Sequence, residues 1–267
     1  MAWLREVFGK HKAVIGMVHL NALPGTALYD ELAGIEALVQ NAERDLEALQ
    51  QGGIDGVMFC NENDRPYAPR AGSAQVAAMS SVISRLLPQI RVAYGVDVLW
   101  DPEASISVAH AVGALFVREV FTGAYASDMG IWAPCASRAL YHRRNIGATN
   151  LKLLFNVSAE FASPLGTRRL GQVAKSVAFG SLPDAICVSG QMTGEQVDTA
   201  ALSEAKNAVN VPVFVNTGVR ADNVADYLRI ADGVIVGTSL KHDGITWNPV
   251  DSHRVEALMR VVNEVRG

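Results

Sequence analysis

The chain of 267 residues contains only three cysteines, Cys60, Cys135 and Cys187, and none of them lies in a CxxC pair or at the spacing of zinc ligands. A disulfide framework or a zinc site is therefore not expected. Cys187 lies in an apolar run, where a buried and unreactive thiol is predicted. Basic residues form no run longer than a pair and the net charge is −4, so nucleic acid is not an expected partner.

No apolar segment approaches the roughly 20 residues that a membrane-spanning helix needs. The first residues are too charged and too few for a secretory signal, and we expect a soluble, cytoplasmic protein. There is no GxxxxGK[ST] motif, so the sequence gives no support for nucleoside triphosphate hydrolysis. No linker, low-complexity segment or shift in composition divides the chain, which predicts a single domain over residues 1–267.

What the sequence does contain is a repeated alternation of short apolar runs and amphipathic segments. Intervals of about 20 to 40 residues between the runs are typical of βα units with a parallel sheet. No GxGxxG follows the first run, so we favour a closed (β/α)8 TIM barrel over a doubly wound open sheet. The eight predicted strands begin near Ala13, Ile54, Arg91, Ala114, Leu151, Asp184, Val211 and Ala231.

Local patterns predict several helix ends. Leu4, Val7 and Phe8 share one face of a short N-terminal helix, which is expected to close the bottom of the barrel. Apolar positions near period 3.6 predict a helix over residues 31–51, which ends at a Gly-Gly pair. Asp222 is predicted to cap the next-to-last helix, and Asp251 or Ser252 the last one.

Two glycine turns follow the last two predicted strands. The first strand ends in Asn216-Thr217-Gly218, and the second ends in Gly237-Thr238-Ser239. One explanation for each glycine is that it does no more than relieve backbone strain after a strand. Two such turns in consecutive units of a barrel instead favour a phosphate-binding site, because the loops after strands seven and eight commonly bind phosphate. Lys241 either adds positive charge there or is solvated.

The other predicted strands end in polar residues, and in a barrel these ends meet at one mouth. Crowded carboxylates raise one another's pKa, which suits acid–base chemistry, and they can also hold a divalent cation. Arg118 and Glu119 are adjacent in a strand, so only one can point inward, and the other is expected to form an ion pair among the helices. The candidate catalytic residues are His19, Glu62, Asp97, Arg118, Asp128 and Glu160, and the candidate substrate-binding residues are Asn61, Asn156, Ser189 and Asn216.

Several of these polar residues have structural alternatives. Asp64 and Asp101 lie beside turns, and their alternative role is simply to cap these turns. His19 could be a structural hydrogen-bond donor, and Trp100 and Trp132 could belong either to a pocket wall or to the core. No lysine is placed at a strand end, which argues against a Schiff-base aldolase.

Four segments together resemble the BtpA/SgcQ family, and the resemblance covers nearly the whole chain. They are KAVIGMVHLNALPG at 12–25, FVREVFTGAYASD at 116–128, VSG at 188–190 and GTSLKHDG at 237–244. The resemblance implies a phosphate-binding (β/α)8 barrel. One branch of the family is linked to photosystem I biogenesis, whereas the SgcQ branch accompanies sugar-uptake and sugar-phosphate genes.

Three strand ends resemble the SgcQ-like branch. The chain has CNEND at 60–64, DVLWDP at 97–102 and NVSAEF at 156–161. The photosystem branch tends to have Glu-Asn-Phe-Gly-Asp, Asn-Val-Leu-Arg and Asp-Val-x-Val-Lys-His at these places. The predicted phosphate site and the polar strand ends favour an enzyme that acts on a phosphorylated sugar or related metabolite, an isomerase, epimerase, lyase or hydrolase. The alternative is a non-catalytic assembly factor. The sequence is compatible with a bound divalent metal ion and with a homo-oligomer, and it requires neither.

Overall fold

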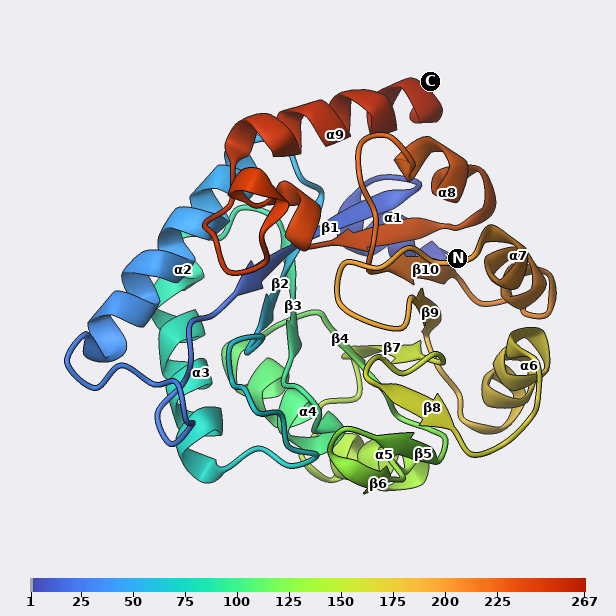
Figure 1. The fold of residues 1–267 in the computed structure, drawn as a ribbon, viewed down its shortest axis with the longest axis horizontal. Helices are drawn as coiled ribbons and strands as arrows, with labels where there is room; N and C mark the ends of the chain where they lie inside the picture. The colour runs from blue at the N-terminus through green and yellow to red at the C-terminus, as the bar shows by residue number, and fades with distance from the viewer. Residues whose placement is uncertain (1) are drawn as a thin grey trace.

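Eight parallel strands close into a barrel in the computed structural model, which describes residues 2–267 (Figure 1). Neighbouring strands follow chain order around the barrel, and the last strand pairs with the first. The fold predicted from the sequence is therefore confirmed. The strands are β1 (Ala13–His19), β2 (Gly56–Cys60), β3 (Ala93–Asp97), β4 (Phe116–Glu119), β7 (Lys152–Asn156), β9 (Ala185–Ser189), β10 (Val213–Asn216) and β11 (Gly233–Val236).

A ring of helices surrounds the strands (Figure 1). Valine-rich outward faces of the strands pack beneath the apolar faces of these helices in one large core. The helices are α1 (Ala2–Phe8), α2 (Gly34–Gln51), α3 (Ser73–Leu86), α4 (Pro102–Val112), α5 (Ala136–Asn145), α6 (Leu170–Gly180), α7 (Thr199–Asn207), α8 (Val224–Ile230) and α9 (Ser252–Arg266), with short 3-10 turns η1 (Leu87–Gln89), η2 (Thr238–Leu240) and η3 (His242–Gly244).

A second apolar core runs through the inside of the barrel to the loops at its mouth, and α1 closes it at the opposite end. Phe8 stacks at a tilt on Phe116, with ring centroids 5.5 Å apart. A side chain at Gly56, the first residue of β2, would collide with Phe8 at 2.8 Å. Glycine at this position lets α1 seat its aromatic ring against the strands, and the predicted plug is confirmed.

A three-stranded antiparallel sheet, absent from the sequence prediction, joins two of the βα loops. It consists of β5 (Tyr125–Ser127), β6 (Gly130–Trp132) and β8 (Ala162–Pro164). Trp132 packs edge-on against Trp100, with ring centroids 5.6 Å apart, and both are almost fully buried. The two tryptophans therefore belong to the core beneath this sheet.

Two predicted helix starts need correction. The helix predicted from residue 31 begins at Gly34, because the Asp30 carboxylate accepts from the N–H groups of Leu32 and Ala33 and holds a turn there. Asp222 does not cap α8. It pairs with Arg220 at 3.0 Å, and the helix begins after Asn223.

Three aspartates act at helix starts and turns. Asp251 caps α9 by accepting from the His253 N–H, as predicted. Asp101 caps α4, and Asp64 accepts from the Leu23 N–H at 2.7 Å, so both are structural residues. No helix among residues 2–267 is long and apolar enough to span a membrane.

Candidate active site

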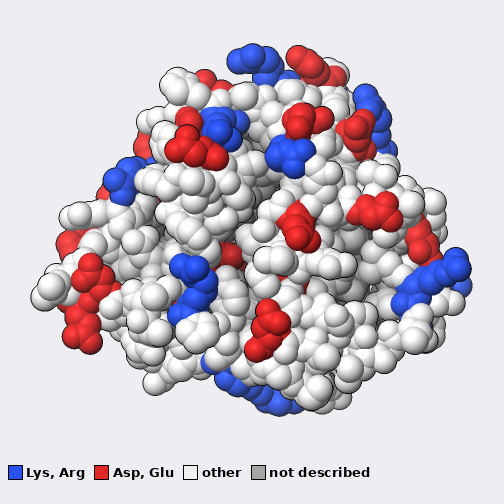
Figure 2. All heavy atoms as spheres, in the orientation of Figure 1, with Lys and Arg blue, Asp and Glu red and all other residues white. Residues whose placement is uncertain are grey.

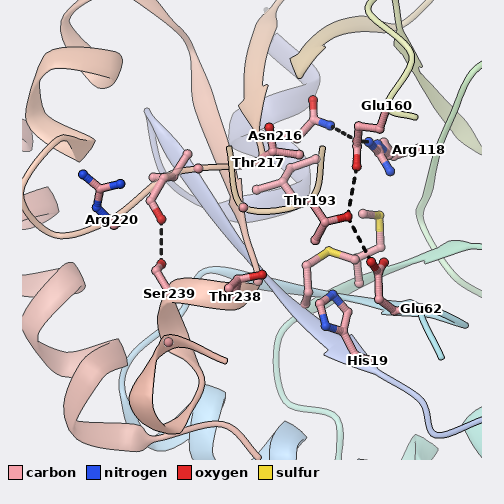
Figure 3. A pocket seen from close by; sticks show the side chains of 18 of the residues that line it. His19, Glu62, Arg118, Glu160, Thr193, Asn216, Thr217, Arg220, Thr238 and Ser239 are labelled. Atoms are coloured by element: carbon pink, nitrogen blue, oxygen red, sulfur yellow. Dashed lines mark hydrogen bonds and ion pairs between the residues drawn. The ribbon is translucent and has the colours of Figure 1, made fainter. Parts of the chain in front are cut away.

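A cavity of about 230 Å³ opens at the carboxyl ends of the strands, where the sequence placed the mouth of the barrel. The face around it is hollowed near its centre, and its acidic and basic side chains are interspersed rather than gathered by sign (Figure 2). The volume lies below the roughly 300–1,000 Å³ typical of sites for drug-sized ligands, so the cavity suits a small metabolite. Its polar lining falls into two groups at different sides (Figure 3).

The first group, called here the anion end, contains both predicted glycine turns. Thr217 and Gly218 adopt successive left-handed conformations, with φ of +75° and +62°. In turns of this kind, neighbouring backbone N–H groups can point toward the same anion. A Cβ at Gly218 would lie 2.2 Å from the Glu195 carbonyl oxygen, so glycine is also required by packing. The anion end consists of Thr217, Gly218, Arg220, Gly237, Thr238, Ser239 and Arg254.

The second glycine turn is tied to the first. Ser239 donates from Oγ to the Val219 carbonyl at 2.6 Å, and Thr238 Oγ1 lies 2.9 Å from Thr246 Oγ1. Gly237 is confined by His19, whose ring would meet a Cβ there at 3.0 Å. The two turns therefore form one connected wall of the cavity, and all five residues predicted for phosphate binding line it.

Arg220 and Arg254 also line the anion end, although neither was predicted as a site residue. Arg220 follows the first turn, two residues after Gly218, and this position could have been recognised in the sequence. Arg254 comes from the first turn of α9, and only the packing of that helix brings it to the cavity. Both guanidinium groups are partly exposed and can bind an anion in a bidentate manner.

The second group, called here the carboxylate end, consists of Glu62, Arg118, Glu160 and Thr193. Glu62 follows β2 and is only 6% exposed. Its Oε1 lies 3.2 Å from the Tyr67 hydroxyl oxygen and 3.1 Å from the Thr193 hydroxyl oxygen. Burial, together with the negative charge of Glu160, raises the pKa of Glu62 to about 7. A group with this pKa can both donate and accept a proton near neutral pH.

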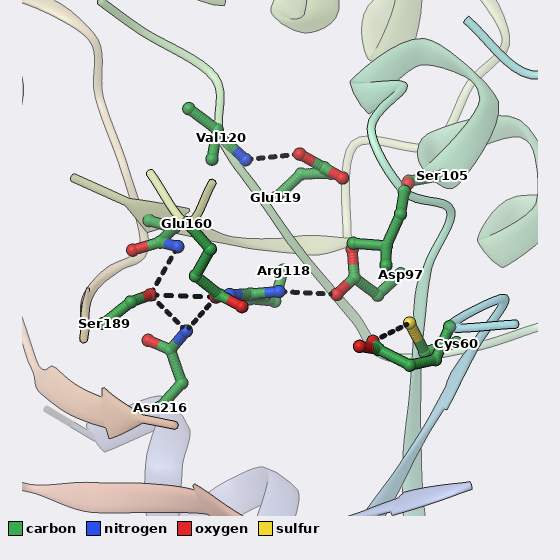
Figure 4. A network of polar contacts seen from close by, with 12 residues as sticks. Cys60, Asp97, Ser105, Arg118, Glu119, Val120, Glu160, Ser189 and Asn216 are labelled. Carbon is green, nitrogen blue, oxygen red and sulfur yellow. Dashed lines mark hydrogen bonds and ion pairs between the residues drawn. The ribbon is translucent and has the colours of Figure 1, made fainter. Parts of the chain in front are cut away.

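Glu160 is fixed by an ion pair with Arg118, which also binds Asp97 at 2.9 Å on its other side. Glu160 Oε1 accepts from Ser189 Oγ at 3.1 Å as well (Figure 4). Asp97 is fully buried below the guanidinium group and does not line the cavity. Of the two adjacent strand residues of which only one was expected to point inward, Arg118 is the one that lines the cavity, and Asp97 supports it by an ion pair.

Glu119 does not form the ion pair among the helices that was predicted for the residue beside Arg118. It is fully buried, and one oxygen accepts from the Val120 N–H (Figure 4). Burial and the negative charge of Asp97 raise its pKa well above the ordinary value, and burial raises the pKa of Asp97 to about 6. One oxygen of each carboxyl group, Asp97 Oδ1 and Glu119 Oε1, is buried without a hydrogen-bond partner among residues 2–267.

His19 lines the cavity between the two ends and is 8% exposed. Burial and the nearby positive charge of Lys241 lower its pKa well below the ordinary value, so the imidazole is neutral. Lys241 is itself buried in an ion pair with Asp45, at 2.5 Å. It is thus neither solvated nor part of the anion end, and its charge acts on both His19 and Glu62.

Besides Asp97, the structure separates four other predicted residues from the cavity. Asp128 is exposed in the turn between β5 and β6. Asn61 is fully buried, accepting from the Leu99 N–H at 2.7 Å and donating to Asp64, so its amide is structural. Asn156 donates to Ser189 Oγ at 2.7 Å, and neither residue lines the cavity.

Asn216 does line the cavity, and its amide lies 2.7 Å from the same Ser189 hydroxyl. Of the residues predicted for substrate binding, only Asn216 therefore reaches the space that a ligand would fill. Thr193, in contrast, was missed. It lies in a loop after β9 with no distinctive motif, and only the fold places it beside Glu62 and Glu160. Within residues 2–267, no three His, Cys, Asp or Glu side chains converge as a metal site would require.

Solved structures confirm the fold. The chain is similar to tryptophan synthase from Mycobacterium tuberculosis, with a TM-score of 0.62, 18% identity, and 96% and 93% of the two chains covered. It is also similar to a thiamine phosphate pyrophosphorylase from Pyrococcus furiosus, with a TM-score of 0.59, 17% identity, and 96% and 97% covered. At these identities the similarity establishes the barrel and nothing about the reaction.

Sequence relatives identify the family. The chain is 46% identical to the sgc region protein SgcQ of Escherichia coli K12, over the full length of both. It is 34% identical to the photosystem I biogenesis protein BtpA of Synechocystis, covering 98% of this chain and 91% of that protein. The higher identity to SgcQ agrees with the SgcQ-like strand ends. The BtpA family description matches residues 10–264, and the chain belongs to the BtpA family.

Proposed function

We propose that this chain is an enzyme that binds a small phosphorylated metabolite, such as a sugar phosphate, and transfers protons on it. One observation carries the proposal. A single cavity has glycine turns and two arginines at one side, and a buried carboxyl group with a pKa of about 7 at the other. The first part suits a phosphate group and the second suits acid–base chemistry.

The two ends assign separate tasks to the residues. The anion end would hold the phosphate through backbone N–H groups, the Thr238 and Ser239 side chains and the two arginines. Glu62 would exchange a proton with the substrate, and Glu160 would act opposite to it. Arg118 and the neutral His19 would stabilise negative charge that develops on a substrate oxygen.

The test is a panel of aldose, ketose and lactone monophosphates, each paired with its unphosphorylated parent. Binding is measured by calorimetry and turnover by NMR. We expect binding only of phosphorylated compounds, with turnover of at least one. Glu62→Gln should lower the turnover rate by about 100-fold or more while leaving the affinity for the phosphorylated compound nearly unchanged. Arg254→Gln should weaken binding. Absence of binding across the panel would refute the proposal.

A second candidate is a non-catalytic assembly factor, which the 34% identity to the Synechocystis biogenesis protein supports. The same variants separate the two functions. A stable protein partner whose capture is unaffected by Glu62→Gln and Glu160→Gln, together with no turnover of any phosphorylated compound, would favour assembly. Loss of turnover in both variants, with intact folding, would favour the enzyme.

A further inference from the structure

The Thr193 hydroxyl lies between the two carboxyl groups of the carboxylate end. Its Oγ1 is 3.1 Å from Glu62 Oε1 and 3.4 Å from Glu160 Oε2, and the two contacts converge on one oxygen (Figure 3). A threonine hydroxyl carries a single proton and can accept two hydrogen bonds. It cannot donate to two carboxylates at once. Both contacts are hydrogen bonds only when one carboxyl group is protonated and donates to Thr193.

The surroundings identify Glu62 as the protonated member. Glu160 is ion-paired with Arg118, whereas no Lys, Arg or His side chain in residues 2–267 forms an ion pair with Glu62. Buried carboxyl groups without a cation retain their proton. The titratable and charged groups around Glu62 are Cys60 on β2, Tyr67 after β2, Asp97 on β3, Arg118 on β4, Glu160 after β7, Lys241 after η2 and His19 on β1.

The position of Thr193 is fixed by its loop. Gly194 adopts a φ of +87°, and its Cβ position lies 3.7 Å from the Thr238 side chain. The Glu195 carbonyl packs so closely on Gly190 and Gly218 that neither could carry a side chain. The loop thus rests on the anion end while its hydroxyl reaches the carboxylate end, so a ligand at the anion end would lie beside Thr193.

We propose that Thr193 relays a proton between Glu62 and Glu160. In the step, the Glu62 O–H bond breaks and its proton passes to Thr193 Oγ1, while the Thr193 proton passes to Glu160 Oε2. One proton moves in total, and the hydroxyl is regenerated. Since this inference rests on the proposed function, it narrows the reaction to one that removes and returns a substrate proton, as isomerisation or epimerisation of a sugar phosphate does.

Titration of Glu62 in the intact protein tests the relay without any substrate. The carboxylic acid band of Glu62 is followed by infrared spectroscopy and assigned by its loss in Glu62→Gln. Thr193→Val removes the hydroxyl at nearly constant volume, and Thr193→Ser is the matched control. The relay stabilises the protonated form of Glu62, so we expect the valine variant to lower its pKa by about one pH unit. The serine variant should titrate like the wild type.

The opposite shift would overturn the relay. If Thr193 only donates to ionised Glu62, its removal raises the pKa of Glu62, and an unchanged pKa would mean no functional contact. The double variant Thr193→Val/Glu160→Gln adds a second measurement. With Glu160 uncharged, the valine substitution should no longer lower the pKa of Glu62. An equal decrease in both backgrounds would refute the coupling to Glu160, and circular dichroism confirms that each variant is folded.

Turnover separates the relay from the proposed function. On a phosphorylated substrate, Thr193→Val should lower kcat by about 10- to 100-fold with little change in KM, and Thr193→Ser should restore it. If the titration follows the expectation but no phosphorylated compound binds, the relay stands and the proposed function fails. If turnover is found but the pKa of Glu62 does not fall in Thr193→Val, the function stands and the relay fails.

Discussion

The two ends of the cavity are built in different ways. At the anion end the arginine side chains are 43% to 44% exposed, and much of the wall is backbone in two glycine turns. At the carboxylate end Arg118 and Glu160 are only 7% and 5% exposed. Exposed cations can bind a hydrated anion and release it, whereas buried charges depend on fixed partners. Under the proposed function, binding and chemistry would take place at separate ends of the cavity, and the two ends should respond differently to substitution.

The largest expected effect is at Arg118. Arg118→Met would leave the Asp97 and Glu160 carboxylates buried without their shared cation. Breaking a buried ion pair in this way costs about 3–5 kcal/mol of unfolding free energy. Urea unfolding at neutral pH measures it. The matched variant at the anion end, Arg220→Met, should lose less than about 1 kcal/mol, because its pair with Asp222 is exposed. Equal losses would contradict the comparison.

The next effect is a pH dependence that belongs to the carboxylate end. The pKa of Glu62 is about 7 in the folded protein and 4.5 as the ordinary value, so the folded state binds more protons between these pH values. Stability should therefore fall as pH rises from 4.5 to 7, by about 3 kcal/mol at most from this group. Glu62→Gln should remove that part of the slope in urea unfolding. Glu36→Gln, on an exposed residue of α2, should leave the slope unchanged.

A smaller effect is expected for charge at the anion end. Arg254→Gln and Arg220→Gln should each weaken the binding of inorganic phosphate by about 10-fold, or roughly 1.4 kcal/mol. Added salt should reduce the difference, because both side chains are partly exposed. Calorimetry measures the affinity, and Arg229→Gln on α8, which does not line the cavity, is the control. Unchanged affinity in both variants would argue against a phosphate site.

The smallest effect concerns the connection between the two glycine turns. Ser239→Ala removes the hydrogen bond from Ser239 Oγ to the Val219 carbonyl. We expect a loss of about 1 kcal/mol in unfolding free energy and a decrease of a few-fold in phosphate affinity. Ser203→Ala, which removes an exposed hydrogen bond to Thr199 within α7, should change stability less and phosphate affinity not at all. A larger effect on affinity than that of Arg254→Gln would reverse the proposed ranking.

The sequence was informative where function lies in a local pattern. The glycine turns at Gly218 and Gly237 could be recognised because strand, turn and neighbouring hydroxyl groups are contiguous. Because side chains alternate along a strand, the sequence showed that only one of Arg118 and Glu119 could point into the barrel, but not which one. Asp222 was assigned wrongly as a cap because its carboxylate found a closer partner in Arg220. Local patterns list the possible partners of a side chain, but they do not rank them.

The sequence by itself determined the barrel, its βα periodicity, the N-terminal plug and the five turn residues of the anion end. Only the tertiary structure decided which strand-end residues share the cavity. It excluded Asp128 and Asn61, placed Asp97 beneath Arg118, and brought Thr193 and Arg254 into the site. The physical reason is that backbone turns are encoded by neighbouring residues. The protonation and contacts of Glu62 and Glu160 depend instead on burial and on charges that are distant in the chain.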